Sequence, residues 1–91
     1  IEPGTYRPGQ WGVRIENLVV NREAGTSAFG DFLNFETLTL CPIDTRCLLP
    51  ERLTQCELEW LNGYHAHVRE RLAPLLKGEA LGWLEARTAP L

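Results

Sequence analysis

The clearest periodicity lies in the second half of the chain, where apolar residues recur at spacings of three and four. This spacing places them on one face of an α-helix, which we expect over about residues 55–73. Thr54 and Glu57 form a capping box at its start. Pro74 should end or kink the helix. The apolar stripe consists of Leu58, Leu61, His65, Val68, Leu72 and Leu75.

A second, shorter helix is expected over residues 79–88, between Gly78 and Pro90. Leu81 and Leu84 should face inward from it.

The aromatic and imidazole side chains of this region can be assigned from their positions on the two helices. Trp60 and Trp83 are interpreted as packing anchors. His65 falls on the apolar stripe and is expected in a core or an interface, whereas His67 falls on another face and is expected in solvent.

The first twenty residues predict a strand, a turn and a strand. The turn residues Arg-Pro-Gly-Gln occupy positions 7–10 and carry strong turn signals. If the turn centres on Gly9, residue i faces residue 18 − i across an antiparallel hairpin. Val13, Ile15 and Val19 then point to one face, toward a core.

The segment between the hairpin and the helices has two parts. Residues 21–31 are polar and rich in Gly, Ser and Thr, which predicts a surface loop and a place for disorder. Residues 32–42 alternate as a strand does, and residues 42–50 turn the chain. The expected class is therefore α+β, an antiparallel hairpin and a strand followed by two C-terminal helices.

Composition limits the partners and the compartment. Ninety-one residues allow one small domain. A net charge of −3 argues against nucleic acid and anionic membranes as partners, and no apolar run approaches the length of a membrane-spanning helix. The odd number of cysteines, three, indicates free thiols in a reducing compartment, such as the cytoplasm.

Cys41, Cys47 and Cys56 are interpreted as buried or bystander thiols. The alternative is a zinc site that combines Cys56 with His65 or His67.

The hairpin register brings two carboxylates together. Glu2 faces Glu16 on the same side of the ribbon, and directly opposed like charges are destabilising at the usual Cβ separation of about 4.5–5.5 Å. A positive group should therefore lie between them, and a metal ion or a metal pair is the obvious candidate. The alternative is a solvated hairpin with surface glutamates. A register slip of one residue would move Glu16 to the other face.

The same register explains two glycines. Gly4 faces Arg14 and Gly12 faces Tyr6, so each large polar side chain has room to lean across the ribbon. Glu2, Tyr6, Arg14 and Glu16 should therefore crowd one face of the hairpin.

Two sets of motifs resemble a known family. Glu-Pro-Gly-Thr-Tyr at residues 2–6 and Gly-Val-Arg-Ile-Glu-Asn at residues 12–17 resemble the end of the catalytic domain in the pita-bread metallopeptidases. That family includes aminopeptidase P, prolidase, methionine aminopeptidase and creatinase. Residues 35–44, 60–65 and 79–84 resemble the C-terminal extension of the larger aminopeptidase P enzymes.

The resemblance implies a chemistry for the crowded face. Glu2 and Glu16 match two ligands of a two-metal centre, commonly of manganese, and Tyr6 and Arg14 match a network that orients such ligands. The metals would activate water and polarise the scissile carbonyl. The implied reaction removes the N-terminal residue from a peptide with proline in second position. Trp11 near the turn would line the substrate cleft or, alternatively, cover the hairpin end.

The resemblance also implies an organisation. Residues 1–44 would be the last strands of a catalytic domain, and residues 45–91 a helical C-terminal extension. The family's centre takes two aspartates and a histidine from earlier strands, so we expect this chain to be a piece of a larger cytoplasmic enzyme, often a homodimer. It should pack against the rest of that catalytic domain. Alone, it should be inactive and hold no metal tightly. Two alternatives are a non-catalytic pita-bread module that binds peptide or protein, and a module for assembly.

Overall fold

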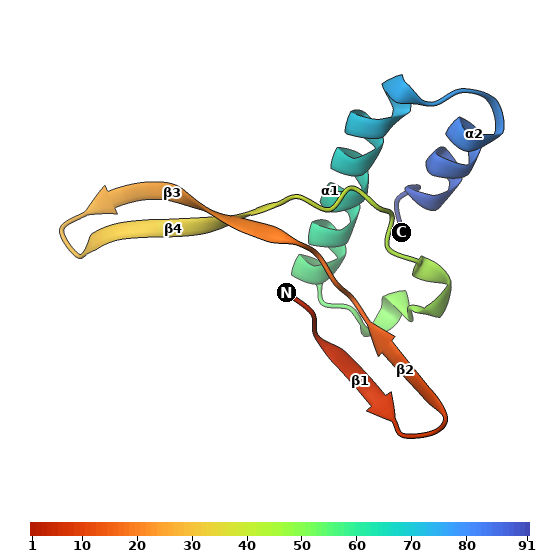
Figure 1. The fold of residues 1–91 in the computed structure, drawn as a ribbon, viewed down its shortest axis with the longest axis horizontal. Coiled ribbons are helices and arrows are strands. Elements are labelled where there is room, and N and C mark those ends of the chain that lie inside the picture. The colour runs from red at the N-terminus through yellow and green to blue at the C-terminus, as the bar shows by residue number, and fades with distance from the viewer. The chain divides into compact units, whose positions relative to one another are not determined.

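The computed structural model describes residues 1–91 (Figure 1). Four strands precede two α-helices, so the expected α+β class is confirmed. The chain forms two compact units, a strand unit, Ile1–Thr39, and a helix unit, Leu40–Leu91. The boundary lies close to the expected division at residue 44, but the assignment of the two parts to a catalytic domain and an extension stays a prediction.

The first hairpin has the expected register. Strand β1 (Gly4–Arg7) pairs antiparallel with β2 (Trp11–Arg14), and Gly4 opposes Arg14 while Tyr6 opposes Gly12. The Gln10 N–H donates to the Arg7 carbonyl at 3.0 Å across the turn. Gly9, at φ 70°, takes the left-handed conformation that position i+2 of a type II turn requires after Pro8.

The second hairpin corrects the expectation of a loop at residues 21–31. Strand β3 (Val19–Ser27) pairs antiparallel with β4 (Gly30–Thr37), and both run through that segment (Figure 1). A bulge between Glu23 and Gly25 interrupts the register, and Gly25 has φ 142°. The loop prediction was wrong because the segment is polar on both faces, so its pairing leaves no alternating apolar pattern. The predicted strand over residues 32–42 also ends early, at Thr37.

Two cross-strand polar contacts between side chains accompany the backbone ladder of this second hairpin. The Thr26 hydroxyl donates to the Asp31 carboxylate at 2.6 Å. Arg22 and Glu36, diagonal neighbours in the ladder, form an ion pair. The apolar side chains of the hairpin lie mainly on β4, where Phe32, Leu33 and Phe35 are each more than half exposed.

The apolar face of the first hairpin remains open. Val13 is 56% exposed and Ile15 is 40% exposed, so the strand unit itself does not supply the core that was expected to cover them. Pro3, Gly4 and Thr5 line a shallow hollow with these two side chains.

The helices begin close to where their sequence signals place them. Helix α1 spans Gln55–Leu72, and the capping box is formed because the Thr54 N–H donates to the Glu57 carboxylate at 2.7 Å. A 3-10 turn, Ala73–Leu75, contains Pro74 and follows α1. Helix α2 spans Gly78–Arg87. Neither helix is both long and apolar enough to cross a membrane.

The core of the helix unit is formed by residues of both helices and of the segment that precedes them. Val68 and Leu84 are fully buried, as their positions on the predicted faces require. Leu75 is 77% exposed, contrary to the prediction, because the turn at Pro74 ends the helical periodicity. Leu40, Ile43, Leu72, Ala73 and Leu76 pack around the cluster of Tyr64, Val68 and Leu84.

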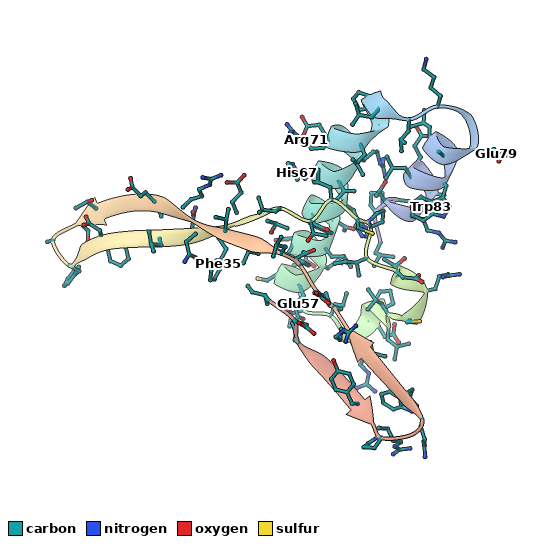
Figure 2. The ribbon with its side chains drawn as sticks, in the orientation of Figure 1. Phe35, Glu57, His67, Arg71, Glu79 and Trp83 are labelled. Carbon is teal, nitrogen blue, oxygen red and sulfur yellow. The ribbon has the colours of Figure 1, made fainter.

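Trp60 and Trp83, which were expected to be packing anchors, are each more than half exposed. Trp60 instead stacks on Tyr64, with ring centroids 5.6 Å apart. Trp83 projects from α2, as Figure 2 shows.

Candidate metal centre

Glu2 and Glu16 lie at the open end of the first hairpin, where backbone hydrogen bonds continue the ladder. The Ile15 N–H donates to the Pro3 carbonyl at 3.2 Å, and the Asn17 N–H donates to the Ile1 carbonyl at 3.1 Å. The residues between these pairs, Glu2 and Glu16, therefore occupy a pair without mutual hydrogen bonds, at which side chains approach most closely. The predicted opposition of the two carboxylates follows from this register.

Arg14 supplies a positive charge to both carboxylates. Its Nε lies 3.8 Å from Glu2 Oε1 and 3.7 Å from Glu16 Oε2. All three side chains are about half exposed, and exposed ion pairs contribute typically about 0–1 kcal/mol each. The sequence predicts Arg14 on the same face as Tyr6 and the two glutamates, but the ion pairs with both carboxylates were not predicted. The signal for that contact was available, because residues 14 and 16 of one strand share a face.

Tyr6 lies flat across the two glycines of the hairpin. A Cβ atom at Gly12 would lie 2.6 Å from Tyr6 Cδ1, and a Cβ atom at Gly4 would lie 2.8 Å from the Tyr6 hydroxyl oxygen. The same Cβ at Gly4 would lie 3.0 Å from Arg14 Cγ. The glycines thus give Tyr6 and Arg14 the space in which they lean toward each other, as predicted.

The electrostatics of Arg14 reflect this arrangement. A hydrogen bond to Tyr6 is the largest cause that raises the pKa of Arg14, and the negative charges of Glu16 and Glu2 raise it further. The guanidinium is charged at any physiological pH, so the effect is on its position. Tyr6 and the two carboxylates hold it over their own face of the ribbon, opposite Val13 and Ile15.

The donor atoms present suit a hard divalent cation, but they are few. Carboxylate oxygens are preferred ligands of magnesium, calcium and manganese. No group of three His, Cys, Asp or Glu side chains in the chain is placed to hold a metal ion. The hairpin therefore offers two carboxylates to a metal, and any further ligands have to come from outside this chain.

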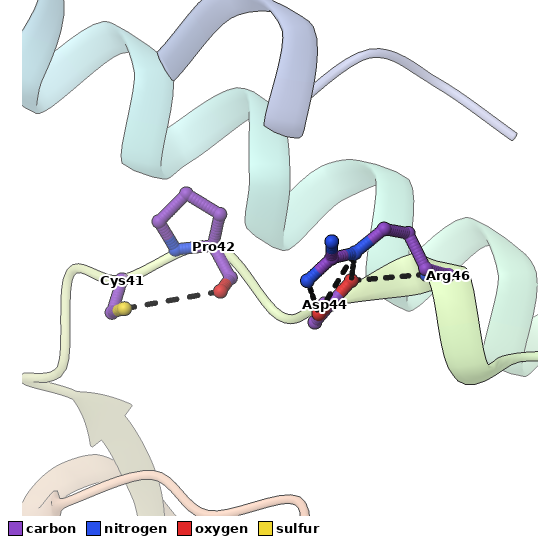
Figure 3. A network of polar contacts seen from close by, with 4 residues as sticks. All are labelled: Cys41, Pro42, Asp44 and Arg46. Atoms are coloured by element: carbon purple, nitrogen blue, oxygen red, sulfur yellow. Dashed lines mark hydrogen bonds and ion pairs between the residues drawn. The ribbon is translucent and has the colours of Figure 1, made fainter. Parts of the chain in front are cut away.

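The other polar candidates do not form a second centre. Cys41, Cys47 and Cys56 are free and exposed, which fits bystander thiols, and the zinc alternative lacks a third ligand. His65 is fully buried and His67 exposed, so both expectations are confirmed. Near Cys41, the Asp44 carboxylate accepts paired hydrogen bonds from Arg46, at 2.9 Å from Nε and 2.6 Å from Nη2 (Figure 3). These contacts hold the pKa of Asp44 well below its usual range.

Trp11 lies at the turn end of β2 and is 51% exposed. The Arg7 guanidinium lies 6.0 Å from its ring centroid, at the limit of a cation–π contact. Its role at a substrate cleft stays a prediction.

Comparison with known proteins gives consistent matches. A model of the C-terminal region of peptidase M24 matches residues 31–91. Over 99% of its length the chain is 43% identical to a probable Xaa-Pro aminopeptidase P of Coprinopsis cinerea, of which it spans 15%. It is 45% identical to aminopeptidase P2 of Arabidopsis thaliana, of which it spans 13%.

A solved structure gives the same result. The whole chain superposes, with a TM-score of 0.84 and 37% identity, on 16% of an X-prolyl aminopeptidase from Caenorhabditis elegans. That protein is described as a cytosolic enzyme with a di-nuclear active site.

Proposed function

The chain belongs to the peptidase M24 family, as its C-terminal region, and from this premise we propose that it is the C-terminal part of a metal-dependent Xaa-Pro aminopeptidase. The whole protein would remove the N-terminal residue from peptides that carry proline in second position. Glu2 and Glu16 would each bind a two-metal centre. Manganese is the proposed metal, and the cytoplasm the proposed compartment.

The observation that carries this proposal is the direct opposition of Glu2 and Glu16 across the first hairpin, which the backbone hydrogen bonds on either side of them require. Two carboxylates that face each other gain from a cation between them. Relatives that match nearly the whole chain are named for this activity, and one is described as having a di-nuclear active site.

Each residue of the hairpin would have a distinct part in the whole enzyme. Glu2 and Glu16 would bind the metals through their carboxylates, and one of them would also accept a proton from the attacking water. Arg14 and Tyr6 would fix the orientation of those carboxylates. When bound, the two ions supply the Lewis acidity that activates water and polarises the scissile carbonyl.

Substitution of each glutamate in the whole protein tests the proposal. Glu16→Gln and Glu2→Gln keep the side-chain size but remove the charge that a divalent ion requires. Metal content and the hydrolysis of an Xaa-Pro-Xaa peptide should both fall, with the fold retained. Glu23→Gln, on the exposed second hairpin, is the matched control and should leave both unchanged. Full metal occupancy together with normal turnover in Glu16→Gln would contradict the assignment.

A second role, in assembly, is favoured by the surface of the helix unit. Trp60 and Trp83 are each more than half exposed, and Leu75 is 77% exposed. Exposed apolar side chains of this size are typical of interfaces. We therefore propose that the whole protein is a homodimer to which the helix unit contributes. The remaining alternative, a non-catalytic module that binds peptides, predicts peptide binding without turnover in the same assay.

A further inference from the structure

Two neighbouring side chains of α1 hold the segment that precedes the helices. The Ile43 N–H donates to His65 Nε2 at 3.1 Å, and the Tyr64 hydroxyl donates to the Cys41 carbonyl at 2.9 Å. Leu40 and Ile43 pack on the core of the helix unit from the same segment. Backbone groups of residues 41–43 are thus bound by side chains of a helix more than twenty residues later in the chain.

The contact with Ile43 defines the protonation state of His65. Because Nε2 accepts a hydrogen bond, the imidazole is neutral and carries its proton on Nδ1. The side chain is fully buried, and Nδ1 has no hydrogen-bond partner. A second proton could enter only at Nε2, which would then be a donor that faces the N–H donor of Ile43. The charged imidazolium would also be buried.

The surroundings of His65 offer no anion to stabilise such a charge. Burial is the main cause that lowers the pKa of His65, and the positive charge of Arg69 lowers it further. Arg69 is fixed in place because its guanidinium donates to the Thr88 hydroxyl at 2.8 Å. Asp44 is bound by Arg46. The other titratable groups on the packed elements are Cys41, Tyr64, Glu85 and Arg87, and the only carboxylate among them, Glu85, is exposed on α2.

We infer that His65 is a pH-sensitive latch for the segment Leu40–Asp44, closed while its imidazole is neutral and opened by protonation at Nε2. The direction of the pH dependence follows because the pKa of His65 is lower in the closed state than in the open state. Above pH ~6.5, the ordinary histidine value, both states are neutral and the latch contributes fully. Below it the open state takes up a proton that the closed state excludes, so closure loses stability as the pH falls.

Hydrogen exchange of the whole protein tests the latch. At pH 5.5, one unit below the ordinary histidine value, the open population should rise up to about tenfold relative to pH 7.5. The protection factor of the Ile43 amide, corrected for intrinsic exchange rates, should fall by the same factor. In His65→Gln the amide oxygen still accepts the Ile43 N–H but does not titrate, so protection should be equal at the two pH values.

Two variants serve as controls. His67→Gln, on the exposed face of the same helix, should keep the wild-type pH dependence. Tyr64→Phe removes the hydrogen bond to Cys41, so it should lower the protection of the Ile43 amide at both pH values. The further fall in protection from pH 7.5 to 5.5 should remain. This variant keeps the test decisive if His65→Gln does not fold. Three outcomes would each overturn the inference. The Ile43 amide of the wild type could be equally protected at pH 7.5 and 5.5, protection could still fall with pH in His65→Gln, or it could fail to fall with pH in Tyr64→Phe.

Discussion

The ring of Tyr6 occupies the space that a side chain at Gly12 would fill, since a Cβ there would lie 2.6 Å from Tyr6 Cδ1. The two residues face each other across β1 and β2. The ring of Tyr6 therefore fits only because Gly12 has no side chain. Arg14 shares this space, since a Cβ at Gly4 would lie 2.8 Å from the Tyr6 hydroxyl oxygen and 3.0 Å from Arg14 Cγ.

Gly12→Ala should displace Tyr6 and so free Arg14. In the whole protein we expect kcat/KM to fall about tenfold, the low end of the effect of losing a partner that orients metal ligands. Tyr6→Ala should have a similar effect, and the double variant should be no worse than Tyr6→Ala, because the clash is then gone. Gly63→Ala, in α1 with open space around its Cβ position, is the control and should not alter kcat/KM. If the losses in kcat/KM from Gly12→Ala and Tyr6→Ala add in the double variant, the proposed contact between these two residues is wrong.

Arg14→Ala should cost about 10–100-fold in kcat/KM of the whole protein while most of the metal is retained. The physical reason is that Arg14 contacts both carboxylates without being a ligand itself. Arg14→Lys should recover only part of the rate, because an ammonium lacks the planar fork that reaches two partners. Rate and metal content are measured together, with Arg22→Ala on the second hairpin as the control. If Arg14→Ala loses as much metal as Glu16→Gln, Arg14 is essential for metal binding and the prediction is wrong.

The isolated 91-residue chain should show no measurable Xaa-Pro peptidase activity and should bind manganese weakly. It offers two carboxylates and no third ligand. Turnover of an Xaa-Pro-Xaa peptide in the presence of manganese is the measurement, followed through purification. Activity that co-purifies with the chain would disprove the prediction.

The capping box should make the start of α1 sensitive to acid. Hydrogen bonds from Thr54 lower the pKa of Glu57 below its ordinary value of 4.5. The stabilisation is therefore complete above pH 4.5 and is lost as the pH falls toward the folded-state pKa. Thr54→Ala should cost about 1 kcal/mol at neutral pH, measured by urea unfolding of the chain. Glu57→Gln should remove the acid dependence, whereas Glu70→Gln, exposed in the last turns of α1, should keep it.

Trp83→Glu should weaken self-association of the whole protein. The side chain is 54% exposed, so a charge there disturbs an interface more than the fold. Light scattering at micromolar concentration measures the molecular mass. His67→Glu, also exposed but polar in the wild type, is the control and should leave the mass unchanged. A wild-type protein that is monomeric at this concentration would exclude the dimer.

Local signals in the sequence were sufficient for the first hairpin and for the helix ends. Pro8 and Gly9 define the turn. Once the centre of the turn is known, every cross-strand pair of the hairpin is fixed, including Glu2 with Glu16. Thr54 and Glu57 define the start of α1 because their hydrogen bonds span only three residues. The components of the candidate site could therefore be predicted from sequence alone.

Only the tertiary structure decided the rest, because the interactions involved join residues that are distant or lack a periodic pattern. The alternation over residues 32–42 predicted most of β4, but the polar sequence of β3 gave no sign that it pairs with β4 through contacts such as Arg22 with Glu36. The exposure of Trp83 depends on which surfaces meet in three dimensions. The bond of His65 to Ile43 joins residues twenty-two positions apart. The sequence by itself determined the turns and caps, where both partners lie within a few residues, and folding decided which more distant groups meet.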